Sequence, residues 1–225
     1  MLQVKRVVNS VFSSNTYILF DEDSDYCWLV DVGDYKRTIT ALPDNKRIAG
    51  IMLTHTHFDH IYGLNDMCKR FPECVVYTSE YGQEALMDDK KNLSRYHEHP
   101  ILFEGRHLRT MRDGDEILLF GNEKMVVKET PGHDPGCLTF LTDRFIFTGD
   151  SYIPGIKVVT KLPGGNRFQS EESVRMILEL SREKIICPGH GETCSSHVAN
   201  QIMNRDSVYG RELVDTLLSY VSIID

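Results

Sequence analysis

The chain has 225 residues, of which 41% are hydrophobic and 26% charged, as in an ordinary globular domain with a substantial core. Its net charge of −8 argues against a broad nucleic-acid-binding surface, and no apolar run reaches the roughly 18–20 residues that span a bilayer. We therefore expect a small-molecule substrate and neither a nucleic-acid nor a membrane partner. Residues 1–8 are too short and too interrupted by polar residues for a secretory signal, so we expect a cytoplasmic protein.

The first half of the chain alternates short apolar runs with turn residues. The expected elements are, in order, strands over 2–8, 15–20 and 26–32, a helix over about 35–42, a strand over 48–53, helical spacing from Ile61 to Cys68, a strand over 74–78 and a helix over 79–87. Pro43 is expected to end the first helix, and Ser79 is expected to cap the last one. The polar segment 88–113 is interpreted as a loop or broken helix where substrate contacts would lie.

The second half returns to strands and then to helices. The expected elements are strands over 116–120, 124–130, 137–141 and 144–148, a Gly- and Pro-rich loop within 151–168, a helix opening at Ser170, a strand over 184–187 and a helical tail from about 195, with an apolar stripe over 208–222. This coarse repetition predicts two similar half-units in a single domain over 1–225. The sequence carries no signal for oligomeric state.

Cysteine chemistry is expected to be minor. The six cysteines form no CxxC pair, and in a chain with a large core they are expected to be reduced and packed as small apolar side chains. Cys187 and Cys194 flank His190, so a metal-ligating role for one of them is the alternative.

A dense polar cluster follows the expected strand over 48–53. His55, His57, Asp59 and His60 lie within six residues, at a strand end where rigid scaffolds present catalytic groups. Imidazole and carboxylate together suit zinc, iron or manganese. The alternative is a solvated loop rich in histidine. Because the whole chain has nine histidines, a cluster this dense favours a metal site.

Three further candidate ligands, His133, Asp150 and His190, each follow an apolar run and a glycine. Glycine permits the backbone conformations of a tight turn from strand to loop. Each residue alone could be structural, but four strand ends with polar side chains predict convergence at one edge. Asp31 also follows a strand; it could accept a hydrogen bond from a ligand histidine, or it could mark a plain turn. His97, His99, His107 and His197 are interpreted as surface histidines.

The order and spacing of these motifs resemble the metallo-β-lactamase fold superfamily. The matching stretches are Thr54-His55-Thr56-His57-Phe58-Asp59-His60, Pro131-Gly132-His133-Asp134-Pro135-Gly136, Thr148-Gly149-Asp150 and Pro188-Gly189-His190-Gly191. The resemblance implies an α/β fold, a four-layer αββα sandwich with metals at one edge. It places one metal on His55, His57 and His133 and a second on Asp59, His60 and His190, with Asp150 bridging both.

Such a site implies a dinuclear hydrolase. Two divalent ions, with zinc expected and iron or manganese as alternatives, can lower the pKa of a bridging water to about 7, so that no protein nucleophile is needed. Asp59 would orient the resulting hydroxide. Asp59 and Asp150 are therefore the expected catalytic residues.

Within the superfamily the motifs are most similar to the glyoxalase II group, which hydrolyses thioesters of glutathione. Two features depart from that group: only a short segment follows His190, and the loop after Asp150 differs. Lys157 and Lys161 in that loop could meet an anionic substrate or simply be solvated. A lactonase remains open, and a persulfide dioxygenase-like oxidoreductase with one iron on His55, His133 and Asp150 is the alternative from another enzyme class.

Overall fold

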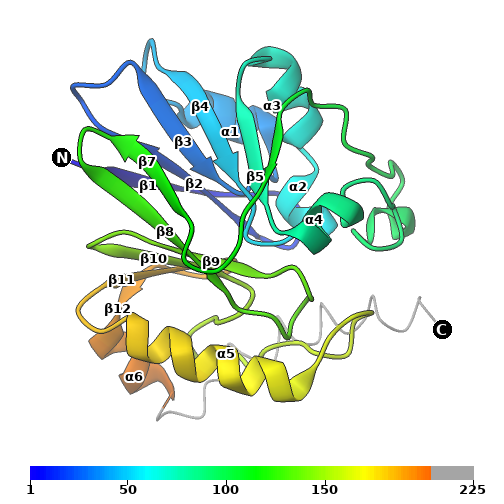
Figure 1. The fold of residues 1–225 in the computed structure, drawn as a ribbon, viewed down its shortest axis with the longest axis vertical. Helices are drawn as coiled ribbons and strands as arrows, with labels where there is room; N and C mark the ends of the chain where they lie inside the picture. Colours follow the sequence, from blue (N-terminus) through cyan, green and yellow to red (C-terminus); the bar gives the residue numbers. More distant parts are fainter. Residues whose placement is uncertain (204–225) are drawn as a thin grey trace.

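A computed structural model of the chain describes residues 1–203. Two six-stranded mixed sheets pack face to face, with helices on their outer sides (Figure 1). The predicted αββα sandwich is therefore confirmed. Among the described residues, no helix is both long enough and apolar enough to cross a membrane.

The first sheet comes from the first half of the chain. Its strands lie in sequence order: β1 (Gln3–Val8), β2 (Asn15–Phe20), β3 (Tyr26–Val30), β4 (Arg47–Met52), β5 (Val75–Thr78) and β6 (Leu108–Thr110). The first three strands are antiparallel, and β3 to β6 are parallel. Strand β6 lies in the segment predicted to be loop. It has three residues and no buried position, so it carries no apolar signal.

The second sheet comes from the second half of the chain. Its strands lie in the order β12 (Cys194–Ser195), β11 (Ile185–Pro188), β10 (Phe145–Gly149), β9 (Leu138–Leu141), β8 (Glu123–Glu129) and β7 (Glu116–Phe120). Strands β10 and β11 are parallel, and the other pairs are antiparallel. The two-residue β12 was not expected from the sequence.

Helices cover the outer faces of both sheets (Figure 1). They are α1 (Tyr35–Ala41), α2 (Phe58–Ile61), α3 (Leu64–Arg70) and α4 (Glu80–Ala85) beside the first sheet, the short 3-10 helix η1 (Ser94–Tyr96), and α5 (Arg167–Leu180) and α6 (Ser196–Met203) beside the second. Helix α5 begins at Arg167 rather than at the predicted Ser170, because the Asn166 side chain accepts a hydrogen bond from Gln169 N and caps it. The helical stripe predicted over 208–222 lies outside the described residues.

The main core fills the space between the sheets. Tyr17 and Trp28 from the first sheet meet Phe140 and Phe147 from the second, all in one buried cluster. Burial of each such side chain stabilises the fold by about 1.5–3 kcal/mol. The Trp28 indole also donates a hydrogen bond to Leu119 O (3.3 Å), which links the two sheets directly. These contacts fix the strand ends of the two sheets relative to each other.

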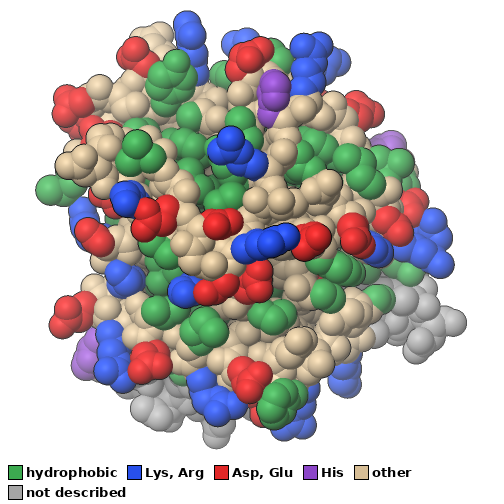
Figure 2. Space-filling model, viewed as in Figure 1, with side chains coloured by type: hydrophobic (Ala, Val, Ile, Leu, Met, Phe, Trp, Pro, Cys, Tyr) green, Lys and Arg blue, Asp and Glu red, His purple; other side chains and the backbone are tan. Residues whose placement is uncertain are grey.

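Charged side chains of both signs are interspersed on the face that Figure 2 shows.

The six cysteines form no disulfide, and all except the half-buried Cys194 are buried, as expected for small apolar side chains.

Candidate metal centre

The seven predicted site residues all come together at one edge of the sandwich. His55 lies just beyond β4, and His57, Asp59 and His60 lie at the start of α2. His133, Asp150 and His190 follow β8, β10 and β11. Each of the seven residues is at most 7% exposed. These seven residues are called the metal cluster below: His55, His57, Asp59, His60, His133, Asp150 and His190.

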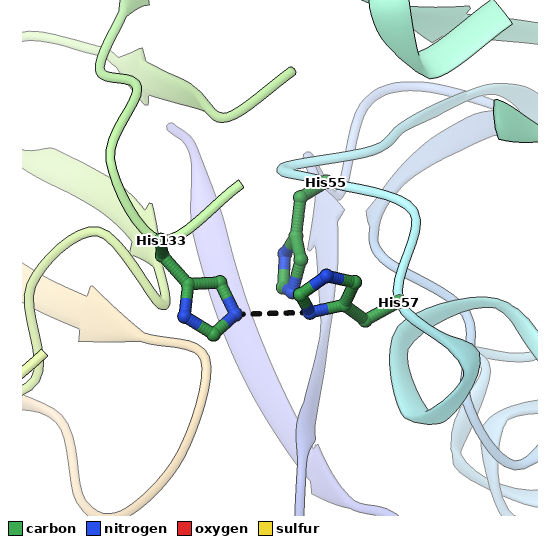
Figure 3. A group of neighbouring side chains, drawn as sticks. All are labelled: His55, His57 and His133. Carbon is green, nitrogen blue, oxygen red and sulfur yellow. Dashed lines mark hydrogen bonds between the residues drawn. The ribbon is translucent and has the colours of Figure 1, made fainter. Parts of the chain in front are cut away.

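The first group in the metal cluster consists of three histidines. His55, His57 and His133 point their rings toward one another from two different loops (Figure 3). Nδ1 of His57 lies 2.9 Å from Nε2 of His133, and the His55 ring centroid lies 4.7 Å and 5.0 Å from those of His57 and His133. The three rings thus present nitrogen atoms to one point.

The second group consists of Asp59, His60 and His190. Oδ2 of Asp59 lies 3.3 Å from Nε2 of each histidine. Asp150 lies between the two groups: its Oδ1 is 3.5 Å from His60 Nε2, and its Oδ2 is 3.6 Å from His133 Nε2 and 3.4 Å from His190 Nε2. The Asp150 carboxylate therefore faces both groups at once.

Several inward-facing atoms of the metal cluster are buried without a hydrogen-bond partner. They include His55 Nε2, Asp59 Oδ2, His60 Nε2, Asp150 Oδ1 and His190 Nε2. A buried polar atom left unsatisfied costs about 1–3 kcal/mol, so this concentration requires a partner. Tetrahedral ligands about 2.0–2.1 Å from a zinc ion lie roughly 3.3–3.4 Å apart, which is close to the separations around Asp59 and Asp150. The residues present therefore fit divalent metal ions.

The outward nitrogens of two histidines are held by hydrogen bonds to backbone carbonyls. Nδ1 of His133 lies 2.8 Å from Val159 O, and Nδ1 of His190 lies 3.0 Å from Phe12 O. Because a carbonyl oxygen can only accept, each of these Nδ1 atoms carries the hydrogen. The Nε2 lone pair then points into the cluster, which is the form that binds a metal.

Asp31 organises the side of the cluster nearest β4. Its Oδ2 lies 2.9 Å from His60 Nδ1, so the predicted hydrogen bond to a cluster histidine is present. It also accepts hydrogen bonds from Thr54 N and Thr54 Oγ1, both at 2.7 Å, and Thr54 Oγ1 lies 3.2 Å from His55 Nδ1. Asp31 has a φ of 57°, a left-handed conformation that a non-glycine residue adopts at some cost. It therefore positions two histidines.

Asp134 was not singled out by the sequence reasoning. Its Oδ1 accepts a hydrogen bond from Gly136 N (2.8 Å), and its Oδ2 lies 3.7 Å from Nε2 of His57. Burial raises the pKa of Asp134 to about 6. The only signal in the sequence was its place directly after His133.

The two groups differ in their electrostatics. Burial holds the pKa of His57 down to about 3 and that of His55 well below its usual range, so both rings are neutral. Burial also opposes charge at His60, but the Asp59 carboxylate and the hydrogen bond to Asp31 outweigh it and raise its pKa to about 9. The carboxylate side of the cluster therefore attracts positive charge, which a proton or a metal ion can supply.

A glycine allows close packing behind Asp150. A Cβ added to Gly189 would lie 2.1 Å from Asp150 Oδ1 and 3.0 Å from His60 Cε1. The backbone of the β11 loop is thus in contact with the metal cluster, which only glycine permits.

A pocket opens over the metal cluster. Beside His57, Asp59, His133 and Asp150, it is lined by half-buried side chains that are called the pocket wall below: Phe12, Phe58, Leu93, Tyr96, His97, Val159 and Leu162. The surface interpretation of His97 was wrong, because its ring stacks on Phe58, with centroids 3.8 Å apart. His99, His107 and His197 are exposed as predicted. Lys157 and Lys161 are exposed and do not belong to the described lining.

Comparison with known proteins gives a consistent result. The family model of the metallo-beta-lactamase superfamily matches residues 9–190. The solved structure of the BLEG-1 B3 metallo-beta-lactamase is similar, with a TM-score of 0.78 and 27% identity over 91% of this chain and 98% of that one.

Two further structures share the fold at lower identity. TTHA1623 in a di-iron-bound form has a TM-score of 0.74 and 23% identity over 91% of this chain and 99% of that one. ETHE1 from Myxococcus xanthus has a TM-score of 0.68 and 22% identity over 90% and 84%.

Proposed function

The chain belongs to the metallo-beta-lactamase superfamily, and on that premise we propose that it is a dinuclear metal-dependent hydrolase of thioesters or related esters. The observation that carries the proposal is the position of Asp150, whose two oxygens face both groups of the metal cluster. A carboxylate in that place can hold two ions side by side. The substrate is a small molecule that enters through the pocket over the cluster.

Each group of the cluster has its own part in this proposal. His55, His57 and His133 would hold one ion, Asp59, His60 and His190 would hold the other, and Asp150 would contact both. Two bound divalent ions supply polarisation of an acyl carbonyl and a water whose pKa is lowered toward about 7. Zinc suits this set of imidazoles and carboxylates, and iron or manganese are the alternatives.

Two carboxylates act on the reaction itself. Asp59 lines both the metal cluster and the pocket, so its carboxylate can accept a proton from the attacking water and orient it. Asp150 would hold both ions through its two oxygens. The wall around them limits the access of bulk water to the reacting carbonyl.

The alternative with one iron on His55, His133 and Asp150 fits the site less well. It leaves Asp59, His60 and His190 without a role, although their ligand atoms lie within 4.8 Å of one another and can hold an ion themselves. A second complete group supports two ions. A lactonase would use the same cluster, so substrate tests separate it from a thioesterase.

The test combines metal content with a substrate panel. We expect two ions per chain by elemental analysis, and turnover of a thioester such as lactoylglutathione above that of a lactone or a phosphodiester. His57→Ala is expected to abolish turnover and lower metal content. His99→Ala changes an exposed histidine and serves as the matched control. A single iron per chain, with oxygen consumption on a persulfide, would overturn the hydrolase proposal.

A further inference from the structure

Three segments that are distant in the sequence meet in the pocket wall. The ring of Phe58, from α2, stacks on that of His97 with their planes 16° apart. Phe12, from the loop between β1 and β2, meets the same imidazole edge-on at 6.0 Å, and Tyr62 stacks behind Phe58 at 5.6 Å. Aromatic contacts of this kind stabilise the arrangement beyond the burial of the rings. The result is one continuous aromatic surface beside the metal cluster.

The segment that carries His97 is held in place by buried polar groups. Asn92 and Ser94 are fully buried; Asn92 Nδ2 donates to Ile101 O (2.9 Å), and Ile101 N donates to Ser94 Oγ (2.8 Å). Leu93 between them has a φ of 61°, in the left-handed region. A residue held in this conformation by a buried network at a pocket points to a functional constraint. The wall is therefore preformed.

Among the described residues, the pocket wall also offers no partner for an anionic acyl group. Of the residues between 1 and 203, those that line the pocket include no lysine or arginine. Arg95, next to the wall residue Tyr96, already pairs with Asp89 through contacts of 2.8 Å and 3.0 Å. An acyl carboxylate placed against the described wall residues would be desolvated without a counter-charge from them, which is costly. The same contact favours binding of an apolar group, because it removes apolar surface from water.

We propose that the pocket wall binds the acyl group of the substrate and selects thioesters or esters whose acyl group is apolar and uncharged. This inference rests on the proposed hydrolase function and adds the chemical class of its substrate. The specificity-determining residues are His97 and Leu162, together with Phe58. Burial of one methylene contributes about 0.8 kcal/mol, so each added methylene that reaches the wall raises kcat/KM about fourfold.

The first experiment varies the acyl group on one neutral thiol. The metal-loaded chain is assayed with acetyl, butyryl, hexanoyl and succinyl thioesters of N-acetylcysteamine. We expect kcat/KM to rise about fourfold per methylene until the wall is filled, and to be about tenfold or more lower for succinyl than for butyryl. A rate independent of acyl length, or a preference for succinyl, would overturn the proposal.

The second experiment changes the wall itself. His97→Ala removes the ring that joins Phe12 to Phe58, so the hexanoyl-to-acetyl ratio of kcat/KM is expected to fall about tenfold. His97→Phe keeps an aromatic ring and is expected to restore the ratio, whereas the exposed neighbour His99→Ala leaves it at the wild-type value. An equal loss on every substrate in His97→Ala would show a purely structural role and contradict the assignment.

A binding measurement separates this inference from the proposed function. S-hexyl and S-(3-carboxypropyl) thioethers of N-acetylcysteamine cannot be hydrolysed, and their affinities are measured by calorimetry. We expect the hexyl compound to bind at least about tenfold more tightly, and His97→Ala to remove that difference. If this holds while no ester or thioester is hydrolysed, the proposed function fails and the wall assignment stands. If esters are hydrolysed but the thioethers bind equally, the wall assignment alone fails.

Discussion

The metal cluster and the pocket wall share one pocket, but different interactions hold them in place. The cluster side chains leave the ends of β4, β8, β10 and β11, and hydrogen bonds fix their outward nitrogens. The wall is held by ring stacking and by a loop that turns at Leu93. The positions of the cluster residues therefore depend mainly on the two sheets, whereas the wall lies largely on loops, two of which also supply the Val159 and Phe12 carbonyls that hold His133 and His190.

Hydrogen bonds between the two sheets help to position the metal cluster. Tyr17 Oη donates a hydrogen bond to Pro188 O (2.7 Å), and Asn15 Nδ2 donates to Pro188 O and Gly191 O, both at 2.9 Å. These contacts run from β2 of the first sheet to the loop that carries His190 on the second. These hydrogen bonds fix the cluster residues from the two halves of the chain relative to one another. A substitution in the cluster should change metal content and turnover, whereas a substitution in the wall should change the preference among acyl groups.

The largest effect is expected from removal of the carboxylate that faces both groups. Asp150→Ala should lower kcat/KM at least about 1,000-fold and reduce the metal content, because the oxygens between the two groups are lost. Circular dichroism should show a folded protein. Asp23→Ala, an exposed aspartate, is the control. Retention of thioester hydrolysis in Asp150→Ala would contradict the role proposed for this residue.

Metal removal should destabilise the protein through the cluster alone. A metal at 100–1,000 times its Kd stabilises the folded state by about 2.7–4.1 kcal/mol, which corresponds to a Tm difference of roughly 5–15 °C for a chain of this size. We expect chelation to lower Tm by that amount and zinc to restore it. Chelation should lower the Tm of the His97→Ala variant by the same amount, because the wall holds no metal. A smaller shift in that variant would show that wall and cluster are coupled.

An effect of intermediate size is expected at Asp31. Asp31→Asn keeps the shape of the side chain but removes the charge that faces His60 and Thr54, so metal affinity should fall about 10–100-fold. Asp34→Asn is the matched control, because Asp34 follows the same strand but caps α1 through Arg37 N. That variant should retain wild-type metal affinity. Equal losses in both variants would mean that the strand end matters and the hydrogen bond to His60 does not.

The metal cluster was predictable because its residues lie in the segments that follow four expected strands. A buried strand fixes where its next residues lie, so a polar side chain after β4, β8, β10 or β11 reaches the common edge wherever the rest of the chain runs. The strands themselves were predictable from their apolar runs. The exceptions, β6 and β12, are two or three residues long, with no buried position in β6.

The pocket wall could not be predicted in the same way. Phe12, His97 and Leu162 come from loops, where no periodic pattern records the direction of a side chain. His97 lies in a polar stretch, and its partner Phe58 is identified only once both loops are placed. Asp134 was missed for a related reason, because its contact with His57 depends on the path of the turn through Gly136.

The smallest effect is expected at Leu162, and it tests the separation of wall and cluster most directly. Leu162 lies in the loop whose Val159 carbonyl accepts the hydrogen bond from His133, so this loop belongs to the wall and also contacts the cluster. Leu162→Ala removes apolar surface from the wall, and the hexanoyl-to-acetyl ratio of kcat/KM should fall about three- to tenfold. Metal content should stay at two ions per chain, as in the exposed control Lys161→Ala. A loss of metal in Leu162→Ala would mean that the wall supports His133, and the two regions would then have to be treated as one.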